Sequence, residues 1–451
     1  MKKTIKLALS AAMVLGATSA FATNGDNMIG QGAKSRAMGG VGIAKGFGAE
    51  SGLANPAMMK SVEKMELMGA ATFFMPSVSF RSDMLAASQG APQPSYADSS
   101  SDFSVIPEIS FAHRVSDKIV YGLSITGTAG LGVDYSDATF GTAKDNGSFE
   151  MKTALQLLKV AIPVSFEDIA GTGIALGVAP IMQYGTLQLS HKAFDPNTGA
   201  PFDRESPKAS DSTFGYEIGL AYDLSKVGVK GLELGAVYKS PLAMEYKDTI
   251  GTSLGDFGAS SLITSGDKLE QPAEIGAGIA YNMGGSTIAF DYKNVKWGSA
   301  AGYSDFGWED QNVFALGYEF ATKSWALRLG YNYGKSPIAE QDASKGLTPS
   351  GVTNYKGGIQ NFFNMAGFPG IVEQHITFGG GYNFTESFGL DAAVVYVPEV
   401  TASYDTSSVT QGFVAQAAQG GVPVDPNASA PSTADVKHSQ MGVTVALSYK
   451  F

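Results

Sequence analysis

Histidine is the side chain that most readily acts as a general base or a metal ligand, and this chain has only four: His113, His191, His375 and His438. They are far apart in the sequence. His375 shares a face with Glu373 and Thr377, but no hydroxyl nucleophile stands in a recognisable motif, and there is no cysteine. We therefore predict no catalytic residue, no metal site and no cofactor, which argues against an enzyme.

Basic residues at inward positions offer a different chemistry, the binding of an anion. Arg328, Lys293 and Lys152 each occupy the polar face of an alternating stretch. A charge-assisted contact with a carboxylate contributes about 1.5–3 kcal/mol, so these three are the candidate ligand-binding cations. The alternative is that they form structural ion pairs, for example Arg328 with Glu319 or Glu373.

Those residues need strands to position them, and the end of the chain shows the pattern. From 440 to 451, apolar and small or polar residues alternate strictly, and one face carries Val443, Val445, Leu447, Tyr449 and Phe451. A terminal strand that ends on an aromatic residue and is apolar on one face is typical of a transmembrane β-barrel. We therefore expect the apolar face to contact lipid and the polar face to line the lumen.

Similar stretches recur about fourteen times, the even number that a closed bacterial barrel requires. They are residues 62–80, 102–114, 118–135, 149–166, 173–191, 212–224, 231–248, 269–283, 286–297, 310–320, 323–336, 372–384, 387–404 and 436–451. Tight turns such as 115–117 and 284–285 alternate with long polar segments such as 192–211 and 337–371. The sequence thus predicts an all-β, antiparallel barrel over residues 62–451.

The start of the chain and its composition indicate where such a barrel lies. Lysines precede an apolar run over residues 7–16, and Ala20-Phe21-Ala22 fits a cleavage site, so residues 1–22 are a predicted signal peptide. After residue 22 there is no run of about 18 apolar residues, so the sequence predicts no transmembrane helix. The net charge of −11 argues against nucleic acid as a partner. We expect a multi-pass protein of the bacterial outer membrane.

Residues 23–61 do not alternate and are rich in small residues, including Gly39 and Gly40. A barrel of about fourteen strands has a wide lumen unless something fills it. We predict that this segment folds inside as a plug, with Asn55, Pro56 and Ala57 forming a fixed turn. The alternative is a flexible periplasmic tail, which would not need the interspersed Met, Ile and Leu.

The run from Gly32 to Gly40, followed by Asn55-Pro56-Ala57, resembles the N-terminal hatch of the FadL/TodX family of outer-membrane transporters. Further similar motifs follow along the mature chain, at 238–241, 291–297, 328–337 and 372–379. The resemblance implies a monomeric barrel that passively moves long-chain fatty acids or other hydrophobic compounds across the outer membrane. It also implies loop capture, lumen binding, hatch movement and lateral exit beside a kinked third strand. Its surroundings would be outer-membrane lipid and lipopolysaccharide, and the barrel-assembly machinery would insert it through its C-terminal strand.

Two further sets of residues are candidates for parts of this route. Gly127, Gly130 and Gly132 lie in the third strand, where they weaken pairing and favour a bulge, so they are the candidate lateral opening. Ordinary barrel curvature is the alternative. The sixth long loop is unusually apolar, and its candidate capture residues are Phe362, Phe363, Met365 and Phe368. They could equally form the loop's own small core.

The sequence departs from the family pattern in one respect. Relatives that bind fatty acids hold the carboxylate with basic lumen residues, but the end of the fifth strand here reads Tyr184-Gly185-Thr186-Leu187-Gln188. An uncharged or aromatic hydrocarbon is therefore an alternative substrate. A general porin is a weaker alternative, because it would lack the plug.

Overall fold

The computed structural model describes residues 23–84, 87, 94–136, 150–194, 201–344, 347–348, 351–419 and 431–451. The predicted signal peptide lies outside this part of the chain. Over the described residues, antiparallel strands close into a barrel of fourteen, with β8 and β9 sharing one place, which confirms the predicted fold class. The barrel strands are β3 Met65–Ser82, β5 Ser104–Ser116, β6 Ile119–Ala129, β8 Lys152–Ala161, β9 Val164–Phe166, β10 Ile174–Phe194, β12 Ala209–Asp223, β13 Leu232–Lys239, β16 Glu274–Asn282, β17 Ser286–Val295, β18 Gln311–Ala321, β19 Trp325–Gly334, β22 Gln374–Asn383, β23 Phe388–Asp405 and β24 Thr433–Lys450.

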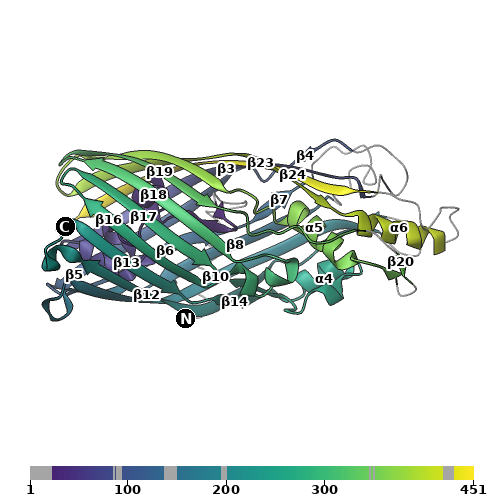
Figure 1. Ribbon diagram of the computed structural model, residues 1–451, viewed down its shortest axis with the longest axis horizontal. Helices are drawn as coiled ribbons and strands as arrows, with labels where there is room; N and C mark the ends of the chain where they lie inside the picture. The colour runs from purple at the N-terminus through teal and green to yellow at the C-terminus, as the bar shows by residue number, and fades with distance from the viewer. Residues whose placement is uncertain are drawn as a thin grey trace.

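The last strand closes the sheet on the first. β24 pairs with β3 along its whole length, from Ala434 opposite Ser82 to Lys450 opposite Glu66. Short turns and the C-terminus gather at one end of the barrel, which we take as the periplasmic end. The other end carries the long connections (Figure 1), with helices α4 Ile250–Gly255, α5 Tyr355–Gly367 and α6 Ser407–Gln419. The sequence analysis had not predicted these helices.

The seventh predicted strand, residues 231–248, is wrong in its second half. β13 ends at Lys239, and Leu242–Glu245 (β14) leaves the barrel to pair with Lys268–Gln271 (β15) in a separate small sheet. Pro241 lies between β13 and β14, and a proline has no N–H to donate to a central ladder. The strand therefore stops before it.

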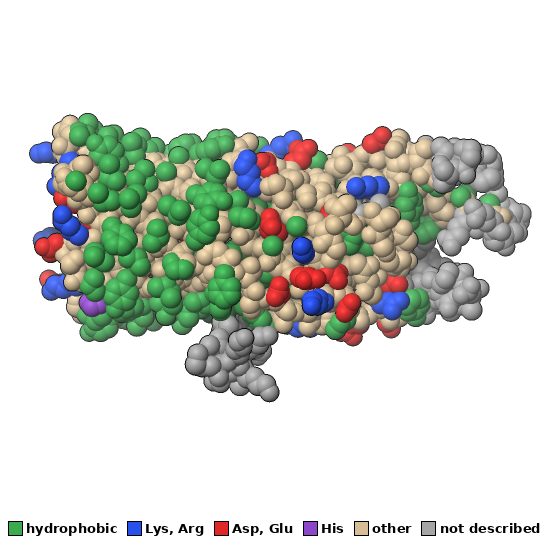
Figure 2. All heavy atoms as spheres, turned by 90° about the horizontal axis from the view of Figure 1, so that it is seen from below, with side chains coloured by type: hydrophobic (Ala, Val, Ile, Leu, Met, Phe, Trp, Pro, Cys, Tyr) green, Lys and Arg blue, Asp and Glu red, His purple; other side chains and the backbone are tan. Residues whose placement is uncertain are grey.

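The outer surface has the alternation that the sequence predicts. Along β19, Leu327 and Leu329 are half exposed, at 50% and 53%, whereas Arg328 between them is buried. Figure 2 shows hydrophobic side chains gathered over the half of the barrel at the left, with charged side chains beyond this band. None of the helices in the described residues is both long enough and apolar enough to cross a membrane. The apolar band is thus the surface that meets lipid.

The segment before the first barrel strand is buried against the inner wall. Its elements are β1 Thr23–Asn24, β2 Asn27–Met28, α2 Gly32–Ala37, and the 3-10 helices η1 Gly48–Leu53 and η2 Pro56–Ser61. Gly39 donates its N–H to Thr377 Oγ1 (2.9 Å), and Asn332 Nδ2 donates to the Gly39 carbonyl (2.9 Å). Gly39 and Gly40 both have positive φ, +71° and +86°, which favours glycine at each position.

Buried ion pairs join this segment to the barrel. Lys45 Nζ lies 2.9 Å from Glu319, Arg36 pairs with Glu108, and Lys34 lies 3.8 Å from Asp391. Arg328 completes the network from the wall, since its guanidinium donates to Glu319 and to Asp391, each at 2.7 Å. Arg328 thus makes the ion pair with Glu319 that the sequence analysis gave as its alternative, and its second partner is Asp391 and not Glu373; both partners lie in barrel strands.

We predict that Leu316→Lys, on the lipid face of β18, lowers the free energy of unfolding by about 2–4 kcal/mol, because it places a charge in hydrocarbon. Ser324→Lys, in the exposed turn before β19, is the matched control and should change stability by less than about 1 kcal/mol. Denaturant unfolding in lipid vesicles measures both. Equal losses would contradict the assignment of the lipid-facing band.

We predict that Arg328→Met lowers the free energy of unfolding by about 3–5 kcal/mol, because it leaves buried carboxylates without their shared cation. Arg328→Lys should lose less. Binding of a fatty acid and of the matching alkane should change by the same factor in Arg328→Met, as calorimetry on the purified variant can measure. A loss confined to the fatty acid would show that Arg328 contacts the ligand carboxylate.

Candidate functional site

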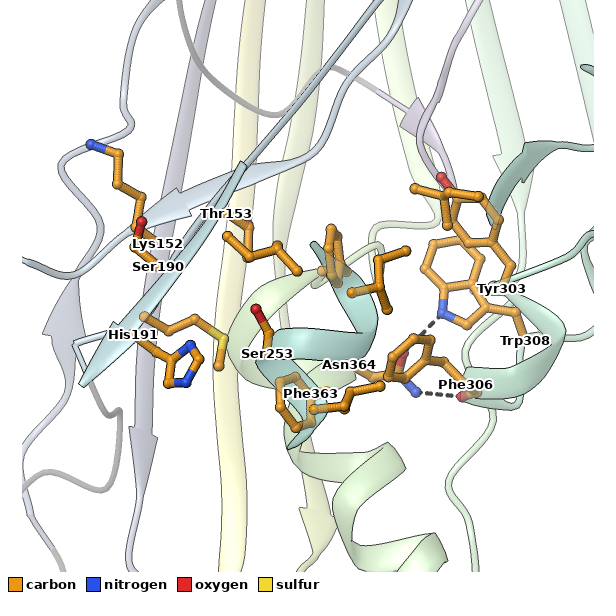
Figure 3. Close-up of a pocket in the computed structure, with 16 residues that line it drawn as sticks. Lys152, Thr153, Ser190, His191, Ser253, Tyr303, Phe306, Trp308, Phe363 and Asn364 are labelled. Atoms are coloured by element: carbon orange, nitrogen blue, oxygen red, sulfur yellow. Dashed lines mark hydrogen bonds between the residues drawn. The ribbon is translucent and has the colours of Figure 1, made fainter. Parts of the chain in front are cut away.

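A pocket lies inside the end of the barrel that carries the helices. It encloses about 620 Å³ of space between atoms, its open mouth included. Figure 3 shows side chains converging on it from β8, β10, α4, α5 and the loop that carries η7 (Ser304–Phe306). The lining residues are Met151, Lys152, Thr153, Leu189, Ser190, His191, Ile250, Ser253, Leu254, Leu269, Tyr303, Phe306, Trp308, Phe363, Asn364 and Phe368.

Most polar groups of this lining are already bonded to protein. Asn364 accepts from Trp308 Nε1 (2.9 Å) and donates to the Phe306 carbonyl (2.8 Å), as the dashed lines in Figure 3 mark. Thr153 Oγ1 donates to the Gly367 carbonyl (2.7 Å). What these groups leave facing the cavity is chiefly hydrocarbon, which suits an apolar guest.

Lys152, one of the three predicted ligand-binding cations, stands at the edge of this pocket. Its ammonium group lies 2.6 Å from Asp134. In Figure 3 the Lys152 side chain points away from the other lining residues. Lys152 is therefore placed to hold the strand Gly132–Asp134 (β7) against β8, and not to meet a ligand in the pocket.

The predicted capture residues divide between pocket and core. Phe363 and Phe368 line the pocket. Phe362 and Met365 are fully buried behind it, and Phe362 packs on Phe80 with ring centroids 6.1 Å apart. Phe363 and Phe368 therefore stay candidates for capture, whereas Phe362 and Met365 pack in the core of the loop region.

The sequence analysis missed the aromatic residues that form the inner end of the pocket. Trp297, Tyr303 and Trp308 pack on one another with ring centroids 4.6–5.1 Å apart. Tyr303 and Trp308 also line the pocket. The available signal was three aromatic residues, Tyr303, Phe306 and Trp308, within six positions of the predicted loop 298–309.

Tyr303 links the pocket to the N-terminal segment. Its hydroxyl donates to Asp26 Oδ2, and Gln271 Nε2 donates to the same oxygen (2.9 Å). Asp26 is fully buried, and burial raises the pKa of its carboxyl to about 6, although both hydrogen bonds act in the opposite direction. Burial also raises the pKa of the Tyr303 hydroxyl well above its usual value, so the tyrosine keeps its proton and remains the donor.

A second, more polar cavity lies on the other side of the N-terminal hairpin, which β1 and β2 form by pairing over residues 23–28. Asn24, Asn27, Thr128 and three lysines are among its lining residues. Lys159 lies 3.4 Å from Glu217 and Lys239 3.7 Å from Glu274. Over the residues that the structure describes, Lys293 makes no ion pair within 4.0 Å, so it is the predicted cation left available to an anion.

The predicted lateral-opening glycines lie where the wall pairing changes. The β5–β6 ladder stops at Glu108 opposite Thr126, although β5 continues to pair with β3 up to Ser104. The β6–β8 register shifts between Gly127 and Ala129. From Thr126 to Val133 every residue is buried, including Gly127, Gly130 and Gly132. The third strand therefore leaves the outer surface at these glycines.

Further along the wall, hydrogen bonds join the residues before β5 to the end of β7 (Gly132–Asp134). Ser100 N donates to the Asp134 carbonyl (2.8 Å), and Asp134 N donates to Ser99 Oγ (2.9 Å). Between the Glu108–Thr126 pair and these two hydrogen bonds, the described residues show no β-pairing between β5 and the β6–β7 side of the wall. We call this stretch the interval. The N-terminal segment reaches this interval, because Asn27 forms a β-bridge with Ala129.

The predicted turn Asn55-Pro56-Ala57 starts η2. Asn55 Oδ1 accepts from the Ala57 N–H (3.0 Å), and Pro56 occupies the first helical position, where no donor is needed. Asn55 Nδ2 donates to the carbonyls of Ile43 (2.7 Å) and Leu220 (3.1 Å). One side chain thus ties the turn to the N-terminal segment and to β12.

The sequence and the fold are both similar to those of known proteins. The family described as outer membrane protein transport protein (OMPP1/FadL/TodX) matches residues 9–350. A long-chain fatty acid transport protein of Escherichia coli O6:H1 strain CFT073 is 22% identical over 346 residues, 66% of this chain and 76% of that protein.

Solved structures share the fold. A Pseudomonas aeruginosa FadL homologue has a TM-score of 0.66 at 13% identity, over 95% of this chain and 100% of that chain. The P. putida toluene transporter TodX has a TM-score of 0.63 at 17% identity, over 94% and 99%. The chain therefore belongs to the OMPP1/FadL/TodX family and is an outer-membrane transport protein.

Proposed function

We propose that this protein carries long-chain fatty acids, or hydrophobic compounds of similar length, passively across the outer membrane. The observation that carries the proposal is the apolar pocket beneath the extracellular helices, whose polar groups are mostly bonded to protein. Each CH₂ group that moves from water into such a pocket gains about 0.8 kcal/mol. A guest with a long hydrocarbon chain is therefore captured far better than a small polar solute.

The N-terminal segment, residues 23–61, is proposed as the hatch that closes the lumen. Its ion pairs to Glu108, Glu233 and Glu319 reach strands on different sides of the barrel. Residues 1–22 are proposed as the signal peptide that precedes it. A hatch of this kind separates the pocket from the periplasmic end, so a guest needs another way out.

We propose that the guest leaves sideways, through the interval between β5 and the kinked β6. The break in pairing there supports this route, because β6 does not pair with β5 beyond the Glu108–Thr126 pair, although β5 still pairs with β3 up to Ser104. A lateral exit delivers an apolar molecule to the bilayer and avoids a step through water. A general porin, the weaker alternative from the sequence, would need an open axial channel.

The choice between fatty acid and hydrocarbon rests on Lys293. A carboxylate in the polar cavity would meet this lysine, and the relative from E. coli is named for long-chain fatty acid transport. The alternative substrate is an uncharged or aromatic hydrocarbon, as the name of the P. putida toluene transporter suggests for that protein. We favour the fatty acid because Lys293 lines the polar cavity and makes no ion pair within 4.0 Å in the described part of the chain, so its ammonium group can bind a carboxylate.

The remaining partners follow from the same proposal. The barrel would work as a monomer, with its apolar band in outer-membrane lipid and its upper rim among lipopolysaccharide. The barrel-assembly machinery would recognise the C-terminal strand, which ends in Tyr449 and Phe451 on the outer face.

We predict that Gly127→Val with Gly130→Val lowers uptake of a labelled fatty acid by intact cells at least about tenfold, because the added side chains obstruct the exit. A Cβ at Gly127 would already lie 2.7 Å from the Ile106 side chain. Gly69→Val, at an open outward position of β3, is the matched control. Normal uptake by the double variant at normal surface expression would exclude an exit at this place.

We predict that Lys293→Met weakens binding of palmitate about tenfold or more, the loss expected when one charge-assisted contact is removed. Binding of hexadecane should stay within about twofold, because an alkane makes no such contact. Calorimetric titration of the purified protein measures both ligands. Equal effects on the two would favour the hydrocarbon as substrate.

A further inference from the structure

The ladder of the barrel wall also stops at a second place, between β12 and the strand that follows β13. β12 pairs with β10 from Ala209 to Tyr222, but with β13 only from Glu217 onward. After Pro241 the chain forms β14, which lies beside β12 but pairs with β15 (Figure 1). In the described part of the chain, residues 209–215 of β12 therefore have a ladder on one side only.

Side chains join β12 to β14 where the ladder is missing. The last backbone bond between the two sides runs from the Ser240 N–H to the Tyr216 carbonyl (3.0 Å). Ser240 Oγ then accepts from the Tyr216 N–H (2.9 Å), and further along Asp211 Oδ2 accepts from the Glu245 N–H (2.9 Å). The two strands are thus held apart by side chains at both ends of a short gap.

A cavity inside the barrel reaches the wall at this gap. We call it the side cavity, and it encloses about 360 Å³ of space between atoms. Tyr216, Ser240 and Leu242, which border the gap, all line it. A Cβ at Gly215 would lie 2.5 Å from the Leu242 side chain, so Leu242 fills the space that glycine leaves. The Leu242 side chain therefore closes the wall where the ladder is missing.

The side cavity adjoins the polar cavity, and the two share the lining residues Asn27, Thr128, Lys159, Lys239 and Glu274. Several polar atoms of this joint lining lack a protein partner. Both polar side-chain atoms of Asn24, Thr128 Oγ1 and Glu217 Oε2 are buried without a hydrogen-bond partner among the described residues. Buried polar atoms next to a cavity need water or a polar solute as their partner. The two cavities are therefore suited to a hydrated content.

The outer side of the gap lies at the edge of the lipid-facing band. Phe214 and Tyr216 point outward from β12 and are 76% and 48% exposed, and Tyr216 packs on Tyr238 with ring centroids 6.0 Å apart. Beyond them, the exposed residues of β12 are Ser210 and Ser212. Aromatic side chains followed by polar ones mark the level of the lipid head groups. Water reaches this level, so a missing ladder is tolerated there.

The charges of the joint lining favour anions. Lys159 lies 3.4 Å from Glu217 and Lys239 lies 3.7 Å from Glu274, so these four charges compensate in pairs. Lys293 is the fifth charged residue of the lining and leaves it with a net charge of +1. A confined positive site with low-dielectric walls concentrates small anions and excludes cations.

We propose that the gap between β12 and β14 is a side port, closed by the Leu242 side chain, through which small water-soluble anions pass from the head-group level to Lys293. A change of the Leu242 rotamer opens the port. The port bypasses both the apolar pocket and the interval between β5 and β6. This inference does not depend on the proposed function, because it concerns small hydrophilic anions and not a hydrophobic guest.

Thiol labelling tests the port. The chain has no cysteine, so Gln183→Cys places a single thiol in the side cavity, which Gln183 lines. A small thiosulfonate reagent that carries a sulfonate is the anionic probe, and its trimethylammonium counterpart is the cationic one. In intact cells we expect the anionic probe to react about tenfold faster, and Lys293→Met to remove this preference. Equal rates for the two probes, or no reaction with either, would overturn the proposal.

The route is tested in the same reporter protein. Leu242→Ala should raise the labelling rate at least about tenfold, because it removes the side chain that closes the gap. Ile181→Ala is the matched control, since Ile181 is buried in the same cluster as Leu242 and lines the same cavity, but lies on β10, one strand away from the gap. Equal acceleration in the two variants would show that loosened packing, and not the gap, admits the probe.

Two further variants keep the test decisive if Leu242→Ala does not fold. Gly127→Val with Gly130→Val narrows the interval beside β6, and Phe368→Trp narrows the apolar pocket, which Phe368 lines. We expect neither to slow labelling of Gln183→Cys by more than about twofold, because neither change borders the port. A larger loss in either variant would place the path of the probe there and overturn the side port.

Discussion

The absence of water in the bilayer core is the constraint on which the rest of this structure depends. Each backbone N–H and C=O that faces hydrocarbon must find its partner within the sheet, so the sheet has to close. The long β24–β3 ladder provides that closure. Closure with fourteen strands creates a lumen too wide for the wall side chains alone to fill. The buried N-terminal segment, with its small residues and ion pairs, occupies that space.

The same constraint applies to the kinked third strand, β6, whose freed backbone groups also need partners. A barrel can leave strands unpaired only where other parts of the chain cover or bond the freed backbone. Here the N-terminal segment supplies a bridge to Ala129, and residues Ser99 and Ser100 rejoin the far end of the interval. The backbone is therefore bonded to other parts of the chain at both ends of the break in pairing. Glycine at 127, 130 and 132 permits it, because no Cβ has to be accommodated where backbones approach closely.

Charge and apolar surface are divided within the lumen. The ion pairs collect around the N-terminal segment, where burial makes an unpaired charge expensive and a paired one a strong positional constraint. The pocket beneath the helices is lined instead by aromatic and aliphatic side chains. Along the proposed route, an apolar guest would therefore meet hydrocarbon first and charge only later, near Lys293. The hairpin between the two cavities is the element that both environments touch.

The sequence alone determined the class of the fold. Apolar and polar residues alternate over ten or more positions in many segments, and a barrel with a lipid-facing outer surface and a polar lumen requires this pattern. It determined the facing of Arg328, Leu327 and Leu329, and the placing of most strands to within a few residues. Tertiary structure decided what alternation does not encode. Arg328 proved to bind Glu319 and Asp391, and Lys152 to bind Asp134, because pairing depends on which strands become neighbours. Tyr303 and Trp308 joined the pocket, and Asp26 reached Tyr303, because contacts between loops and a distant N-terminus have no period in the sequence.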